Sequence, residues 1–236
     1  NEFDAELKAA RELPEQIFDV LELVKDSHPM DALRTAVSAL ASFDEDRNDN
    51  SAEATIRKGN RLTSQVPSIV MAHHNIRQGK DPIKPSANLN HAGNFLYMLN
   101  GDEPSADTAE LMDKDFVLHA DHGSNASAFT ARVVAGTAAD IHGAVTAGIA
   151  ALSGPSHGGA AENVMQMAKE IGKPENAADY VKNLLSNRER VMGFGHRVYK
   201  AEDPRAGHLR AGVKKLSEEM GQPEWYQILE AVVEAM

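Results

Sequence analysis

The sequence contains no cysteine among its 236 residues. Without thiols the chain can form no disulfide, and it has no thiolate to act as a nucleophile or metal ligand. This composition is compatible with a reducing compartment, and we expect a cytoplasmic protein. The first thirteen residues are acidic and amphipathic. They lack the basic start and apolar core of a signal peptide, so we predict no secretory leader in this stretch.

Basic residues are also scarce, with 24 Lys and Arg against 35 Asp and Glu, which gives a net charge of −11. Phosphate contacts need a basic surface, so we expect no nucleic-acid partner. No apolar run is long enough to cross a bilayer, and we expect no membrane partner. Any anionic ligand must therefore bind at a local cluster of arginine and histidine side chains.

Aromatic residues make up only 5% of the chain, and no strand-like alternation of apolar and polar residues occurs. Apolar residues instead recur at helical spacing nearly everywhere, which predicts an all-α fold. In the first half we expect helices after Pro14, after Pro29, from Asn50 or Ser51 towards Gly79, and near 89–99, 104–120 and 127–152. Glu53 is available for a capping box at the third of these helices.

Small residues dominate the stretch from Ala126 to Ala151, which predicts a closely packed, buried helix pair. Arg132, Asp140 and His142 interrupt this stretch and exclude a membrane span. Further helices are expected from Gly159 to about Gly172, from Pro174 to about Asn187, from Asp203 and Pro204 to Gly221, and from Pro223 onward. The last apolar pattern is still running at Met236, and we expect both ends of the chain to be cut.

The segment from Arg190 to Ala206 reads RVMGFGHRVYKAEDPRA, with Gly193 and Gly195 flanking Phe194 just before His196. Paired glycines permit unusual backbone conformations and a close approach to a ligand. Between Arg188 and Arg205 five basic residues face three acidic ones, which favours an anion-binding loop. A basic surface loop with a structural turn is the alternative. The basic residues are Arg188, Arg190, Arg197, Lys200 and Arg205.

Two further histidine motifs precede this segment. GPSHGGA places His157 in a glycine-rich bend before a helix, whose N-terminal amides favour developing negative charge. A turn histidine without a role is the alternative. HADHGSNASAF contains His119 and His122, three residues apart and on one face if helical. We interpret His119 as a satisfied core histidine. A metal site is disfavoured because cysteine and the HExxH spacing are absent.

GPSHGG, then GFGHRVYK followed by DPRA, occur here in the order and spacing of the citrate synthase family. HADHGSNAS and the HPM segment at His28 to Met30 add to the resemblance, which covers nearly the whole chain. The exact residues of these motifs resemble those of the bacterial and archaeal short-chain branch of the family. That branch contains citrate and 2-methylcitrate synthases. The resemblance implies an all-α fold with a large helical domain over 1–156 and a smaller domain over 157–236, which closes over the active site.

The resemblance also implies roles for individual residues. His157 corresponds to the histidine that hydrogen-bonds the thioester oxygen, and His196 to the one that polarises the oxaloacetate ketone and donates a proton. These two would be the catalytic residues. Oxaloacetate would contact His122, His196, Arg205 and Asn125. The coenzyme A contacts implied are Val191, Met192, Gly193, Phe194, Gly195, Arg197 and Lys200.

The family forms homodimers, holds no tightly bound cofactor and uses acetyl-CoA as a cosubstrate. Its catalytic base is an aspartate in a motif resembling NVDFYSG, which is absent here, so we assign no base within these residues. One active-site arginine comes from the partner subunit. We therefore expect a polypeptide of these residues alone to be inactive. Two alternatives stay open: a 2-methylcitrate synthase that uses propionyl-CoA, and a non-catalytic helical interaction protein of the same fold.

Overall fold

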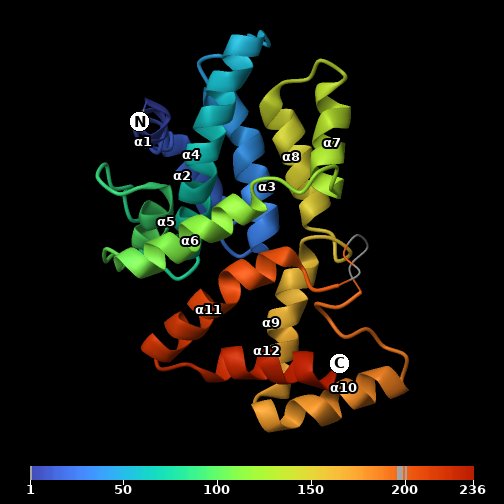
Figure 1. Cartoon of the computed structure of the whole chain (residues 1–236). Coiled ribbons are helices and arrows are strands. Elements are labelled where there is room, and N and C mark those ends of the chain that lie inside the picture. The colour runs from blue at the N-terminus through green and yellow to red at the C-terminus, as the bar shows by residue number, and fades with distance from the viewer. Residues whose placement is uncertain (1, 196–198, 200) are drawn as a thin grey trace. The chain divides into compact units, whose positions relative to one another are not determined.

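The computed structural model describes residues 2–195, 199 and 201–236, and every regular element in that part of the chain is helical (Figure 1). The all-α prediction is therefore confirmed. The chain divides into two compact units, one ending at Ser153 and the other beginning at Gly154. Among the described helices, none is long and apolar enough to cross a membrane.

Over the described residues 2–153, the first unit contains eight α-helices and one short 3-10 turn. The core lies where α2, α3, α4 and α8 meet, around Ile17, Leu21, Val37, Leu62 and Ile69. Figure 1 shows α3 running beside α4, and α8 packs on α3. The elements are α1 (Glu2–Ala9), α2 (Glu15–Leu23), α3 (Pro29–Leu40), η1 (Ala41–Phe43), α4 (Ala52–Ile76), α5 (His91–Asn100), α6 (Ala106–His119), α7 (Ala126–Ala135) and α8 (Ile141–Leu152).

Polar side chains begin most of these helices by accepting a hydrogen bond from the first turn. Ser51 Oγ accepts from the Ala54 N–H at 3.3 Å, so the predicted start of α4 is confirmed. Such caps satisfy backbone donors that a helix leaves without intrahelical partners. Glu53 lies two residues after the cap, whereas a capping box needs the acid three residues after it. The expectation for Glu53 is therefore wrong.

Helices α7 and α8 form the predicted close pair, and Gly148 shows why small residues are needed there. A Cβ atom at Gly148 would lie 3.4 Å from the Ser127 backbone oxygen on α7. The expectation that both helices are buried is wrong, however, because no residue of α7 is buried within this unit. Phe129 and Val133 are 62% and 55% exposed. Composition predicts close helix approach, but it does not reveal which face remains uncovered.

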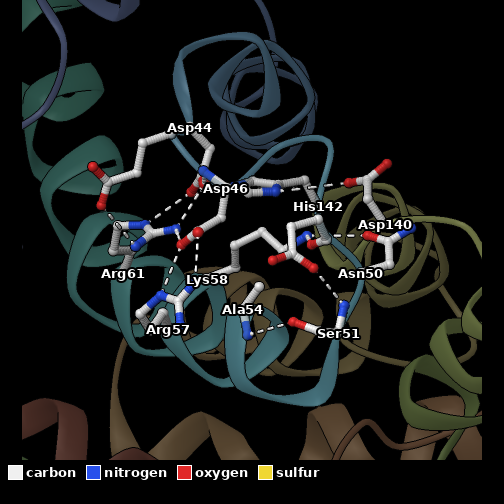
Figure 2. A network of polar contacts seen from close by, with 12 residues as sticks. Asp44, Asp46, Asn50, Ser51, Ala54, Arg57, Lys58, Arg61, Asp140 and His142 are labelled. Atoms are coloured by element: carbon white, nitrogen blue, oxygen red, sulfur yellow. Dashed lines mark hydrogen bonds and ion pairs between the residues drawn. The ribbon is translucent and has the colours of Figure 1, made fainter.

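A network of charged groups joins the segment after α3 to α4 and α8 (Figure 2). Arg61 donates to both carboxylate oxygens of Asp44, at 2.9 and 2.7 Å, and to Asp46 at 2.7 Å. Burial raises the pKa of Asp44, but hydrogen bonds from Arg61 and from the Asp46 N–H outweigh it and lower the pKa overall. His142 lies in the same network, with Nε2 3.6 Å from an Asp44 oxygen.

Lys58, fully buried, anchors the other side of this network. Its ammonium donates to the Asp49 carbonyl at 2.6 Å and to the Asn50 side-chain oxygen at 3.1 Å. Asn50 in turn donates to the carbonyl of Ala138, in the turn before α8, at 3.2 Å. A buried ammonium requires several oxygen acceptors, and the loop before α4 supplies them. Together with the Asn50 bond, these contacts connect that loop to the turn between α7 and α8.

The second unit is built around α12, which contacts α9, α10, η2 and α11. Its core contains Met167, Ile171, Val181, Ile228 and Val232. The segment 187–203 connects α10 to α11 and carries the basic glycine-rich motif. The elements are α9 (Gly159–Ile171), η2 (Pro174–Asn176), α10 (Ala177–Ser186), α11 (Pro204–Glu219) and α12 (Glu224–Ala235).

Candidate active site

The HADHGSNAS motif lies at the end of α6 and in the loop that leads to α7. His119 is the last residue of α6, whereas His122 lies three residues further on, outside any helix and half-buried. The two side chains therefore do not share a helical face. The His119 side chain is 54% exposed, and its Nδ1 lies 2.8 Å from the Asp115 carbonyl oxygen. The interpretation of His119 as a core histidine is wrong.

Asn125 begins α7, and this position limits what it can offer a ligand. Its side-chain oxygen accepts a hydrogen bond from the Ala128 N–H at 3.1 Å. The oxygen is thereby used to cap the helix, as is common for asparagine. The chemistry left to Asn125 is donation from its side-chain NH₂ group, which suits a carboxylate or ketone oxygen.

His157 lies in a turn directly before α9, as the glycine-rich bend predicts. Its N–H donates to the Gly154 carbonyl at 2.9 Å, and its own carbonyl accepts from Ala160 at 3.2 Å. The first amides of α9 are thus engaged inside the turn: Gly159 donates to Gly154 at 3.3 Å and Ala161 to Gly158 at 3.2 Å. The expectation that the N-terminal amides of this helix favour developing negative charge stays a prediction. The turn also carries the half-buried imidazole of His157.

The segment Val191 to Gly195 is anchored at one end and exposed at the other. Val191 is buried in the core of the second unit, so its side chain serves packing. Gly193 and Gly195 have φ of 89° and 76°, a backbone region that favours glycine. Phe194 between them is 40% exposed. Two glycines with positive φ thus flank an exposed aromatic side chain, and Val191 anchors the segment in the core. Residues 193–195 themselves are exposed.

Arg205 lies in the first turn of α11 and forms a bidentate pair with Asp203. Nη2 donates to one carboxylate oxygen at 2.7 Å, and Nε lies 3.1 and 3.2 Å from the two oxygens. The same carboxylate caps α11 by accepting from the Arg205 backbone N–H at 2.9 Å. The guanidinium carbon also lies 5.9 Å from the centre of the Tyr199 ring, within cation–π range.

The sequence did not predict the contacts of Arg205 with Asp203 and Tyr199. Asp203 was predicted only as a helix cap, although an aspartate two residues before an arginine at a helix start is a detectable signal. His196, Arg197 and Lys200, three of the predicted site residues, lie outside the described residues. His157, Arg205 and the 191–195 segment belong to the second unit, whereas His122 and Asn125 belong to the first.

A shallow pocket in the second unit has a volume of about 470 Å³ and lies between α10 and α12. Its lining is mostly apolar, with Lys182 and Ser186 as the polar members, and it contains none of the motif residues. We assign no chemistry to it, because a site needs convergent polar groups as well as volume. The candidate site is therefore defined by the three motifs.

Comparison with known proteins agrees with these motifs. A family model described as "Citrate synthase, C-terminal domain" matches residues 1–236. A protein of Deinococcus radiodurans named citrate synthase is 46% identical over 231 residues, which is 98% of this chain and 61% of that protein. A protein of Mycobacterium tuberculosis named 2-methylcitrate synthase is 38% identical over 233 residues, 97% of this chain and 59% of that protein.

Among solved structures, citrate synthase from Pyrobaculum aerophilum matches with a TM-score of 0.91 and 35% identity, over 99% of this chain and 61% of that one. The chain belongs to the citrate synthase family. It spans about 60% of the length of the relatives it matches.

Proposed function

We propose that the protein containing this chain condenses acetyl-CoA with oxaloacetate, releasing citrate and coenzyme A. The observation that carries this proposal is the match of the family model to all 236 residues, which include the three histidine motifs and DPRA. The reaction removes a proton from the thioester methyl group, attacks the oxaloacetate ketone with the resulting enol or enolate, and hydrolyses the thioester. Each step develops charge on an oxygen atom, which donors in the site must stabilise.

The imidazole of His157 is proposed to donate a hydrogen bond to the thioester oxygen as the enolate forms. Its turn is held by bonds from His157 to Gly154 and from Ala160 to His157, so the ring starts from a defined backbone. A donor fixed in this way stabilises developing charge without having to reorganise during the reaction. His196 is proposed to polarise the ketone of oxaloacetate and to protonate the new alkoxide.

Arg205 is proposed to hold one carboxylate of oxaloacetate, with His122 and the NH₂ group of Asn125 as further donors. A guanidinium has five N–H donors arranged to pair with carboxylates in a bidentate manner. The local excess of basic residues between Arg188 and Arg205 offsets the overall charge of −11, which would otherwise repel two anionic substrates. Coenzyme A is proposed to meet Val191 to Gly195, with Arg197 and Lys200 near its phosphates, and no tightly bound cofactor is proposed.

A second candidate reaction is the condensation of propionyl-CoA with oxaloacetate to 2-methylcitrate. The relative from Mycobacterium tuberculosis named 2-methylcitrate synthase favours keeping this candidate. The two thioesters differ by one methylene group, and a pocket discriminates such a difference only about 10- to 200-fold. Acetyl-CoA is the first choice, because the match to a protein named citrate synthase has the higher identity, at 46%.

The test is release of free coenzyme A by the full-length protein given oxaloacetate and either thioester. A thiol reagent reports only coenzyme A if the rest of the protein also lacks cysteine, as these 236 residues do. We expect release with acetyl-CoA that depends on oxaloacetate, and a slower rate with propionyl-CoA. Absence of release with both thioesters, in folded protein, would overturn the proposal. A faster rate with propionyl-CoA would select the second candidate.

We further infer that the protein acts as a homodimer in the cytoplasm. Exposed apolar side chains on α7 support a subunit contact, because an exposed apolar face is typical of interfaces. Phe129 and Val133, four residues apart and so on one face of α7, are 62% and 55% exposed. Sedimentation equilibrium should give twice the subunit mass, and a monomer at micromolar concentration would contradict this assignment.

A further inference from the structure

Arg205 is held from two directions by residues of its own unit. The Asp203 carboxylate takes the side of the guanidinium that carries Nε and Nη2, with the shortest contact at 2.7 Å. The guanidinium carbon also lies over the Tyr199 ring, 5.9 Å from its centre. An ion pair and a cation–π interaction thereby restrict a long, flexible side chain.

The geometry of the pair decides between two possible roles for Asp203. A carboxylate bound end-on, to Nη1 and Nη2, would take the position of an incoming substrate carboxylate and would compete with it. Asp203 instead binds side-on through Nε and Nη2. A guanidinium can receive carboxylates along more than one edge, because its five N–H groups point outward in one plane. The observed pair therefore uses the edge between Nε and Nη2, not the edge between Nη1 and Nη2.

We propose that Asp203 is a positioning residue, which orients the Arg205 guanidinium toward the carboxylate of oxaloacetate. This inference rests on the proposed function of Arg205. Asp203 also begins α11 and accepts the Arg205 backbone N–H at 2.9 Å, so the orienting group is itself fixed to the helix. At metal sites, removal of such an outer partner of a ligand commonly costs at least tenfold in affinity, and we expect an effect of the same order here.

Asp203→Asn is the informative variant, because asparagine caps helices as well as aspartate does but cannot form the ion pair. In the full-length protein we expect the KM for oxaloacetate to rise about tenfold. We expect kcat at saturating oxaloacetate to change less than about threefold, because a bound substrate restores the orientation of Arg205. If the asparagine variant fails to fold, Asp203→Ser keeps a capping oxygen and serves the same purpose.

Glu202→Gln is the matched control. It removes the same charge one residue away and breaks a comparable pair, in which Arg210 donates to Glu202 at 2.6 Å. Arg210 keeps a second partner, Glu230, at 3.4 Å. If Asp203 acted only through its negative charge, both variants would lower the KM for the anionic substrate. The positioning role predicts a rise for Asp203→Asn and a change of less than about twofold for Glu202→Gln.

A double-mutant cycle with Arg205→Gln tests whether Asp203 acts through Arg205. In the Arg205→Gln background, Asp203→Asn should leave the KM for oxaloacetate unchanged, since the group it orients is gone. The inference is overturned if the KM in Asp203→Asn is unchanged or lower, if Glu202→Gln raises it equally, or if the effect persists in the Arg205→Gln background.

Failure of the proposed function looks different from failure of this inference. A wild-type protein that binds no oxaloacetate by calorimetry would overturn both. A wild-type KM in Arg205→Gln would remove the substrate role of Arg205, and the positioning role with it. An active wild type with a strongly impaired Arg205→Gln and a normal Asp203→Asn would overturn the positioning role alone.

Discussion

Arg61 in the first unit and Arg205 in the second each bind an aspartate through a bidentate pair. Arg61 binds Asp44 at 2.9 and 2.7 Å, and Arg205 binds Asp203 with its shortest contact at 2.7 Å. The surroundings differ more than the contacts do. The Asp44 side chain is 3% exposed, whereas that of Asp203 is 31% exposed. The first pair joins residues 17 positions apart, and the second joins residues two apart.

This difference separates a structural pair from a candidate binding pair. Asp44, Asp46 and Arg61 connect separate elements (Figure 2), and their side chains are 3%, 15% and 18% exposed, so a ligand has little access to them. Arg205 needs no distant element, and its pair remains partly open. A bidentate pair is therefore not by itself an indication of a site. Exposure, a local basic excess and a neighbouring glycine-rich loop make the difference.

The largest expected effect on stability is that of Arg61→Met. Removing this guanidinium leaves the carboxylate of Asp44 buried and deprives Asp46 of one partner. Breaking a buried ion pair from one side costs about 3–5 kcal/mol. Urea unfolding of the full-length protein, followed by circular dichroism, should show that loss. We expect a smaller loss if the loop before α4 opens and hydrates Asp44.

Arg57→Met is its control, because Arg57 binds the same Asp46 at 2.6 Å but is itself 52% exposed. Pairs of this kind contribute about 0–1 kcal/mol. Equal losses in the two variants would show that burial does not distinguish the pairs, and the comparison between the units would then lose its basis.

The next largest effect is on catalysis, where we expect His157→Ala to lower the rate of proton exchange and Arg205→Ala to lower the affinity for oxaloacetate. Loss of a donor to a developing oxyanion costs about 100-fold or more in rate, so His157→Ala should slow exchange of the acetyl-CoA methyl protons. Its affinity for oxaloacetate should stay within a few-fold of wild type. Arg205→Ala should mainly weaken oxaloacetate binding, because it removes a charged contact to the substrate.

Calorimetric titration with oxaloacetate and proton exchange followed by NMR measure these two effects. An equal loss of oxaloacetate affinity in both variants would contradict the assigned roles. Unfolding midpoints close to wild type are the control, and they are expected, since neither side chain belongs to a hydrophobic core cluster.

Local patterns predicted the fold well. Helix starts at Ser51 and at Asp203 followed from capping chemistry that acts within three residues. The turn before α9 followed from the glycines and proline around His157. The sequence did not predict helix α1 (Glu2–Ala9), whose single buried residue is Leu7. A helix so short gains its stability from packing on α4 and α5, which a local pattern does not contain.

The ionic network was not predicted, because Asp44, Arg61 and His142 come together only when η1, α4 and α8 pack. No spacing rule relates residues so far apart in the chain. The prediction of a shared helical face for His119 and His122 was wrong for a local reason. The spacing of the two residues fits a helix, but the helix ends at His119. Patterns near helix ends are unreliable, since a shift of one residue changes which side chains share a face.

The smallest expected effect is a change in the pH dependence of stability caused by His142→Gln. His142 is 1% exposed, and its Nε2 has no hydrogen-bond partner among the residues that the structure describes. Burial lowers the pKa of His142 below its usual 6.5, against the opposing charges of Asp44 and Asp140, while Lys58 and Arg61 lower it further. The unfolded chain then binds a proton more readily than the folded one. The stability contributed by the neutral ring is complete above about pH 6.5 and is lost as the pH falls towards the lowered pKa.

Unfolding free energies of wild type measured between pH 5 and pH 8 should therefore rise with pH. His142→Gln should flatten this rise without removing it, because burial also lowers the pKa values of His73 and His91. A slope equal to that of wild type would show that His142 does not titrate within the network, for instance because the ring hydrates when the loop before α4 opens. A slope that vanishes entirely would show that His142 alone carries the acid sensitivity of the first unit.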